Sequence, residues 1–220
     1  MNKTGVIYGI NGPVIYLKGN TGFEMSEMVY VGKERLVGEV IALTQDTTTV
    51  QVFEETTGLK PGEIVEASGD AISVLLAPGI LNNIFDGIER PLSEIAAKSG
   101  KYISRGLSVD SLDTERLWDV HITIKAGDKV SGGTVIAETQ ETPAILHKSM
   151  VPPNLSGTIL KAAPDGKYKI FDEIAVLQLS DGKEVPLTLA QKWPIRVPRP
   201  SAARYASSEP LVTGQRIDRK

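Results

Sequence analysis

Short apolar segments, separated by glycines, prolines and charged turns, fill the first 67 residues of the chain. In residues 49–53 apolar and polar side chains partly alternate, as on a strand with one buried face. Further segments of this kind are residues 6–8, 14–17, 28–31, 36–43 and 64–65. About six strands at this spacing predict a small closed β-barrel over residues 1–67, because closure leaves no sheet edge unpaired.

Residues 68–110 predict a short connecting segment with mixed α and β structure. Residues 72–76 favour a strand, and Gly87 is placed to end a short helix that follows it. The residues expected on one face of that helix are Ile80, Leu81, Ile84 and Phe85.

A second short helix is expected to begin near Pro91, because proline suits the first helical position, and to end at Gly100. Its Leu92, Ile95 and Ala96 would share one face.

Residues 111–190 return to the strand pattern and predict a second β domain. Val120, Ile122 and Ile124 alternate with the polar Asp119, His121 and Thr123. The other candidate strands are residues 134–137, 144–146, 157–160, 174–179 and 185–189, with turns at 163–166 and 180–183. From Lys192 onward, prolines at 194, 198 and 200 oppose regular pairing, so residues 191–220 are expected to form an extended C-terminal linker.

Composition narrows the classes of function. Twenty-four Lys and Arg residues against 27 Asp and Glu give a net charge of −3, which argues against a nucleic-acid surface. The absence of cysteine excludes disulfides and thiolate metal sites and fits a cytoplasmic protein. No window reaches the ~18 apolar residues that a membrane-spanning helix needs, so any link to a membrane is expected to run through partners.

Candidate chemistry is sparse. No stretch has the form G-x-x-x-x-G-K-[ST] that cradles nucleotide phosphates, and the nearest glycine cluster, residues 127–133, reads as a turn. His121 is expected at the surface, and it lies far in sequence from the other histidine, His147. The acidic pairs at 54–55 and 172–173 are interpreted as solvated turns. The chain is therefore predicted to contain no catalytic, cofactor-binding or metal-ligating residue.

Residues 127–133 with Glu138, and later residues 155–159, are similar to a lipoyl or biotinyl carrier domain. Such a carrier needs a lysine at a hairpin tip, and the matching position holds Pro143. Lys148 is the only other lysine nearby, and it is five residues out of register. The fold, a flattened β-sandwich of two similar halves, is therefore expected to be shared without the carrier chemistry.

Five blocks in order resemble the catalytic A subunit (alpha chain) of V/A-type rotary ATPases. They are residues 5–15, 36–41 followed by 51–59, 78–92, 192–196 and 210–216, and the block at 78–92 is the most specific. The resemblance implies an N-terminal barrel at 1–67 and a first segment of a nucleotide-binding domain at 68–110. It also implies a bulge insertion at 111–190 and a re-entry into the nucleotide domain at 191–220.

The resemblance further implies a function and partners. A subunits alternate with B subunits in a hexameric head, where the barrels form a crown and the bulges point towards the peripheral stalk. The complete protein uses ATP or ADP with Mg, and couples hydrolysis or synthesis to proton or sodium transport from a position peripheral to the membrane. No nucleotide-binding residue can be transferred to this sequence, so we expect a fragment that serves head assembly and stator contact and is inactive alone.

Two departures qualify the resemblance: residues 201–208 are only weakly similar, and residues 217–220 do not continue the family's nucleotide core. The alternative from another class is a free-standing scaffold or interaction module that reuses these folds. Without a nucleotide domain to cover them, Ile80, Leu81, Ile84 and Phe85 are expected to be exposed.

Overall fold

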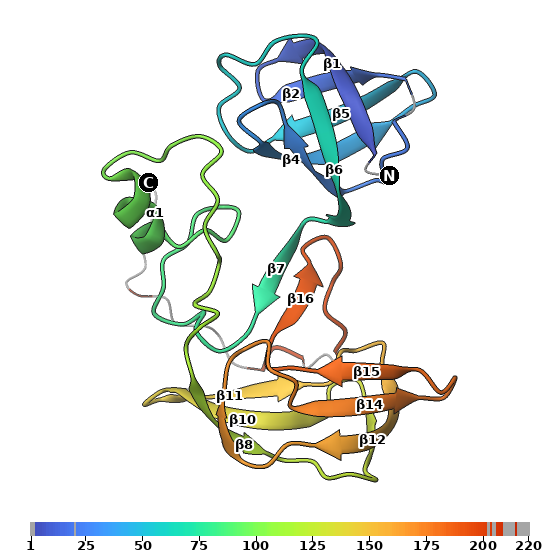
Figure 1. Cartoon of the computed structure of the whole chain (residues 1–220), viewed down its shortest axis with the longest axis vertical. Helices are drawn as coiled ribbons and strands as arrows, with labels where there is room; N and C mark the ends of the chain where they lie inside the picture. The colour runs from blue at the N-terminus through green and yellow to red at the C-terminus, as the bar shows by residue number, and fades with distance from the viewer. Residues whose placement is uncertain (1–2, 20, 202, 204–205, 209–213, 215–220) are drawn as a thin grey trace.

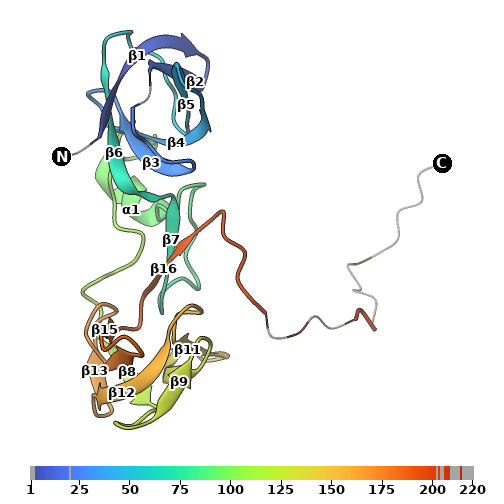
Figure 2. The same ribbon diagram turned by 90° about the vertical axis from the view of Figure 1, so that its right-hand side faces the viewer.

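The computed structural model describes residues 3–19, 21–201, 203, 206–208 and 214. Within these residues it contains sixteen strands and one helix, which confirms the prediction of a mainly β fold. The strands form a barrel at one end of the molecule and a sandwich at the other (Figure 1). A two-stranded sheet and a long loop with the helix join these two bodies (Figure 2).

The predicted N-terminal barrel is confirmed. It closes in the order β1-β2-β5-β4-β3-β6, and alternate residues of β3 point inward. Valines supply much of its interior: Val29, Val31, Val50 and Val65 are all fully buried. The strands are β1 (Thr4–Asn11), β2 (Val14–Lys18), β3 (Glu27–Val31), β4 (Leu36–Leu43), β5 (Thr47–Val52) and β6 (Ile64–Ala71).

The helix expected around residues 80–85 does not exist. That segment consists of turns, and Phe85 makes an isolated antiparallel bridge to Pro91. Gly79 and Asn82 have φ angles of 111° and 67°, which lie outside the right-handed helical region. The spacing of apolar residues is therefore not sufficient to predict a helix here, because the backbone at Gly79 and Asn82 is not helical.

The second predicted helix is present as α1 (Leu92–Ser99), which begins directly after Pro91. Gly100 ends it with a φ of 75° and donates its N–H to the carbonyl of Ala96. Ile95 is its only buried residue, so the predicted apolar face with Leu92 and Ala96 is narrower than expected. Nowhere in the described ranges is a helix long and apolar enough to cross a bilayer.

The chain returns from the sandwich as a strand, where the sequence predicted none. β16 (Gln191–Pro194) pairs antiparallel with β7 (Ser73–Leu76). Pro194 is the last residue of β16 and pairs with Ser73, so its missing N–H falls at the strand end. The family block at 210–216 lies outside the described residues except for Gly214, and residues 202 and 204–205 of the predicted linker also lie outside them.

The second β domain is a sandwich of two four-stranded sheets, as predicted. One sheet has the order β11-β10-β8-β13 and the other β15-β14-β12-β9. Ile136, Ile159, Ile170 and Leu177 form part of the core between them. The strands are β8 (Trp118–Ile122), β9 (Lys129–Ser131), β10 (Val135–Thr142), β11 (Ile145–Met150), β12 (Ser156–Ala162), β13 (Gly166–Tyr168), β14 (Ala175–Leu179) and β15 (Glu184–Leu187).

The expected exposure of four apolar residues is correct for two of them. Leu81 and Ile84 are 42% and 73% exposed. Ile80 and Phe85 instead pack against the sandwich core. The sandwich therefore covers part of the connecting segment, which leaves a smaller apolar surface in solvent than the sequence suggested.

Gly157 in β12 marks a close approach between strands. A Cβ at this position would lie 2.0 Å from the carbonyl oxygen of Gln178 in β14. We expect Gly157→Ala to lower the free energy of unfolding by about 1–3 kcal/mol, because the sheet must move to admit the methyl group. Urea unfolding followed by tryptophan fluorescence measures this, since Trp118 lies in the sandwich core. Gly87→Ala is the control, because its Cβ would meet nothing within 4 Å; equal destabilisation by both would contradict the prediction.

Candidate functional site

Three buried glutamates hold the connector, which we define as residues 72–110 together with residues 191–197. Glu39 and Glu54 belong to the barrel region, and Glu141 belongs to β10 of the sandwich. Their side chains are only 1%, 8% and 3% exposed. We call these three residues the anchor glutamates, since each binds connector groups that are distant in sequence.

Glu39 binds the segment that follows β16. The Nε of Arg196 donates to Oε1 of Glu39 at 2.9 Å, and its Nη2 donates to Oε2 at 2.5 Å. These hydrogen bonds and the charge of Glu39 raise the pKa of Arg196. A two-pronged pair of this kind fixes orientation as well as distance, so residue 196 is fixed against β4 of the barrel.

Glu54 binds the opposite limb of the connector. Its Oε2 accepts the N–H of Gly106 at 2.9 Å and lies 3.6 Å from Nη1 of Arg90. Arg90 also donates to Asp86 at 2.7 Å and to the carbonyl of Leu107 at 3.1 Å. The arginine therefore ties together three parts of the structure: the barrel, the turn before α1 and the loop after it.

The Arg90 network also controls the charge state of Asp86. Burial opposes ionisation of this carboxyl, but hydrogen bonds from Arg90 and from the N–H of Ile88 outweigh it and lower the pKa of Asp86. Asp86 consequently stays charged beside the guanidinium. Oε1 of Glu54 has no hydrogen-bond partner among the described residues. Glu54 is also one of the residues that line a cavity of about 420 Å³ between the barrel and the connector.

Glu141 binds the connector from the sandwich side. Its Oε1 accepts the N–H groups of Gly79 and Leu81 at 2.7 and 2.9 Å, and its Oε2 lies 3.2 Å from Nδ1 of His147. Burial lowers the pKa of His147, against the opposing effect of the Glu141 charge. The neutral ring thus completes the hydrogen bonding of a carboxylate that is almost wholly removed from water.

The prediction for the acidic pairs is wrong at Glu54 and correct at residues 172–173. Glu55, the neighbour of Glu54, is exposed and accepts a hydrogen bond from Thr57. Asp172 and Glu173 are both exposed, and Asp172 accepts the N–H of Lys169 in a turn. Nothing in the local sequence distinguishes Glu54 or Glu141 from a solvated acid, because their partners lie 52 and 62 residues away.

The two histidines and the glycine cluster at residues 127–133 do not form a catalytic or metal-binding arrangement in the described structure. His121 is exposed on β8, with Nδ1 2.7 Å from Oδ2 of Asp165. Residues 127–133 form a turn, the short strand β9 and a second turn, as expected of a connection between strands. β10 separates His121 on β8 from His147 on β11. Across the ranges that the structure describes, no three metal-ligating side chains gather at one place.

Pro143 lies in the two-residue turn between β10 and β11, the hairpin tip at which a carrier domain would display its lysine. Lys148 instead lies within β11, with its Nζ 3.7 Å from Glu138 on the neighbouring strand. The sandwich thus has the hairpin of a carrier without a lysine at its tip.

Two family models match the chain. The model described as "ATP synthase alpha/beta family, beta-barrel domain" matches residues 7–69, which span most of the barrel. The model described as "ATPsynthase alpha/beta subunit barrel-sandwich domain" matches residues 109–196. The two matches therefore coincide with the two bodies of the fold.

Similar proteins match across nearly the whole chain. The V-type ATP synthase alpha chain of Halothermothrix orenii is 49% identical over 217 residues, which are 99% of this chain and 37% of that protein. The corresponding A subunit from the A-type ATP synthase of Methanopyrus kandleri is 46% identical over 97% of this chain and 36% of its own length. A V-type ATP synthase alpha chain of Clostridium tetani is 47% identical over 97% of this chain and 36% of its own length. The chain thus spans little more than a third of these relatives.

Removal of one anchor glutamate should release its part of the connector. We expect Glu141→Ala to leave the N–H groups of Gly79 and Leu81 without acceptors and to cost about 2–4 kcal/mol. Amide hydrogen exchange at residues 79 and 81, followed by NMR, should become much faster. Glu138→Ala is the matched control on the same strand, since Glu138 pairs with the exposed Lys148 and holds no connector amide among the hydrogen bonds of the described residues. Unchanged exchange in Glu141→Ala would contradict the role of this anchor.

The two histidines should titrate on opposite sides of the ordinary value of 6.5. The hydrogen bond that the His121 ring donates to Asp165 raises the pKa of His121, whereas burial lowers the pKa of His147. NMR titration of the ring protons measures both. Because the folded state resists protonation of His147, its contribution to stability should be lost as pH falls below 6.5, and His147→Gln should reduce this loss. The contribution of the His121 pair should instead be lost as pH rises through its raised pKa.

Proposed function

We propose that this chain, which belongs to the ATP synthase alpha/beta family, forms the barrel and bulge portions of the A subunit of a V/A-type rotary ATPase. One observation carries the proposal: 49% identity to a V-type ATP synthase alpha chain extends over 99% of this chain. The barrel and the sandwich are each matched by a domain model of the same family.

Within this proposal each part of the chain has a place. Residues 1–67 form the crown barrel, and residues 111–190 form the bulge insertion. Residues 68–110 and 191–220 are segments of the nucleotide-binding domain. The exposed Leu81 and Ile84 support this division, since apolar side chains of a connecting segment are the natural contact surface for the rest of such a domain.

The proposed role is assembly of the ATPase head and contact with its stator. The barrel pairs with B subunits in an alternating hexamer, and the sandwich faces the peripheral stalk. The assembly stands in the cytoplasm against the membrane, where the complete enzyme binds ATP or ADP with Mg and moves protons or sodium ions. This chain alone contributes no catalytic, nucleotide-binding or metal-binding residue, in keeping with the absence of a G-x-x-x-x-G-K-[ST] sequence.

The outer face of the barrel offers a specific contact surface for that assembly. Val6 of β1 and Ile64 of β6 pair directly across the two strands and are 52% and 55% exposed. Tyr8, two residues along β1, is 51% exposed. Together these side chains give an apolar strip on the barrel surface, which is typical of a protein contact.

Co-expression with a V/A-type B subunit tests the proposal. We expect a complex that co-purifies with the 220-residue chain, and at least a tenfold loss of affinity (about 1.4 kcal/mol) for the double variant V6E/I64K. Asp119→Lys on the exposed outer face of β8 is the control, because it changes charge in the sandwich and leaves the barrel intact. Failure of the unaltered chain to bind any B subunit would instead favour the scaffold interpretation.

A further inference from the structure

The sandwich has four edge strands, and three of them are protected against further pairing. β9 and β13 are only three residues long, and β15 contains Pro186, which cannot donate a ladder hydrogen bond. Short edges and prolines are two of the means by which proteins prevent unwanted strand addition, and charged side chains and bulges are others.

β11 has neither form of protection. It is six residues long, contains no proline and forms the edge of its sheet. Ile145, Leu146 and Met150 are 46%, 45% and 40% exposed along it. A long edge with exposed apolar side chains presents unpaired backbone N–H and C=O groups to an incoming strand.

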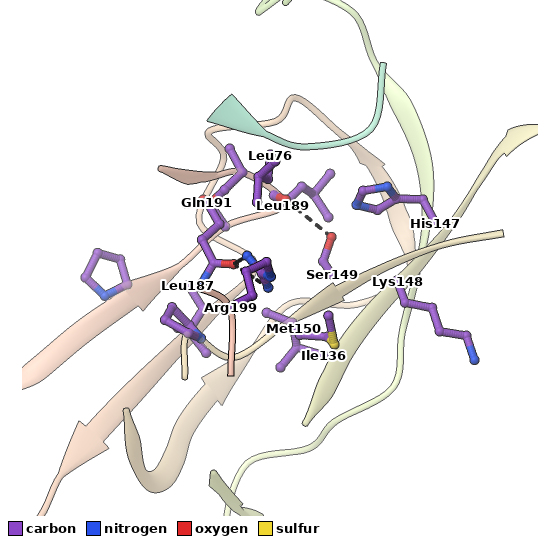
Figure 3. Close-up of a pocket in the computed structure, with 14 residues that line it drawn as sticks. Leu76, Ile136, His147, Lys148, Ser149, Met150, Leu187, Leu189, Gln191 and Arg199 are labelled. Atoms are coloured by element: carbon purple, nitrogen blue, oxygen red, sulfur yellow. Dashed lines mark hydrogen bonds between the residues drawn. The ribbon is translucent and has the colours of Figure 1, made fainter. Parts of the chain in front are cut away.

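A cleft of about 310 Å³ lies beside this edge, and we call it the edge cleft. β11 forms one side of it, and residues 186–191 form the other. Ile136, Leu187 and Leu189 contribute its apolar lining, and Ser149 bonds across it to the carbonyl of Leu189 (Figure 3). An incoming strand could therefore place alternate side chains against an apolar surface, because side chains alternate between the two faces of a strand.

The positive charge of the edge cleft favours an occupant with an acidic side chain. None of its lining residues is acidic. Arg199 enters it beside Gln191, with which it makes two long hydrogen bonds of 3.4 Å (Figure 3). Its guanidinium also lies 4.4 Å from the ring centre of Trp193, and none of the ion pairs among the described residues includes it. Lys148 also lines the cleft (Figure 3), and its Nζ lies 3.7 Å from Glu138 on the neighbouring strand.

We propose that β11 accepts an extended segment of a partner polypeptide as an additional strand, and that an acidic side chain of this segment pairs with Arg199. Backbone hydrogen bonds to β11 would supply affinity, as in other cases of strand addition. The arginine would supply specificity, because a guanidinium and a carboxylate match in charge and geometry. This surface is separate from the barrel strip through which we propose B-subunit contact.

A short acetylated peptide in which valine and glutamate alternate is the probe. Added to the ¹⁵N-labelled chain, it should shift the backbone amide signals of residues 145–150 and slow their hydrogen exchange. Two further versions carry N-methyl groups on either the odd or the even residues. One version should lose about tenfold or more in affinity while the other retains it, because only one edge of an added strand bonds to β11.

Arg199→Gln tests the charge part of the proposal. It should weaken the glutamate peptide about tenfold and remove its advantage over the matching glutamine peptide. Lys129→Gln on β9, at the edge of the other sheet, should leave binding unchanged. The proposal is overturned if both N-methylated peptides bind equally, if the shifts map away from β11, if millimolar peptide gives no shift, or if β11 pairs with a second copy of the chain.

Discussion

The arrangement of this molecule depends on carboxylates that are buried at the boundaries of its domains. An ionised carboxylate removed from water costs several kcal/mol unless charged or hydrogen-bonding partners replace the water. Glu39 receives those partners from Arg196, 157 residues away. Glu54 and Glu141 receive theirs from backbone amides 52 and 62 residues away. If the connector separated from the barrel or from the sandwich, a buried carboxylate would lose its hydrogen-bonding partners.

Apolar packing at the same boundaries performs a different task. Ile80 and Phe85 contact the sandwich core, and this burial favours contact without selecting one orientation, because the hydrophobic effect is not directional. The anchor glutamates add direction: each bond requires a donor at a defined place and angle. The barrel, the sandwich and the connector can thereby keep a defined relation to one another.

The sequence predicted what depends on local periodicity and missed what depends on distant partners. Alternation at residues 120–124 identified a strand, and Gly100 identified a helix end, because both signals lie within a few residues. The helix at 80–85 failed since apolar spacing does not report the left-handed backbone at Asn82. The sequence does not indicate β16 because Pro194 opposes pairing within a strand, whereas a proline at a strand end costs little. Glu54 and Glu141 look like ordinary surface acids until the fold brings their partners to them.

The open edge and the anchors meet at one residue. His147 lies on β11, lines the edge cleft and bonds to Glu141 through Nδ1. A strand that pairs with β11 would therefore cover the partly exposed ring of His147, the partner of a carboxylate that holds the connector amides of Gly79 and Leu81. Hydrogen bonds strengthen as the local dielectric falls, so occupation of the edge would tighten the attachment of the sandwich to the connector. The edge of β11 and the buried Glu141 are thus coupled through His147, although nothing in the sequence associates them.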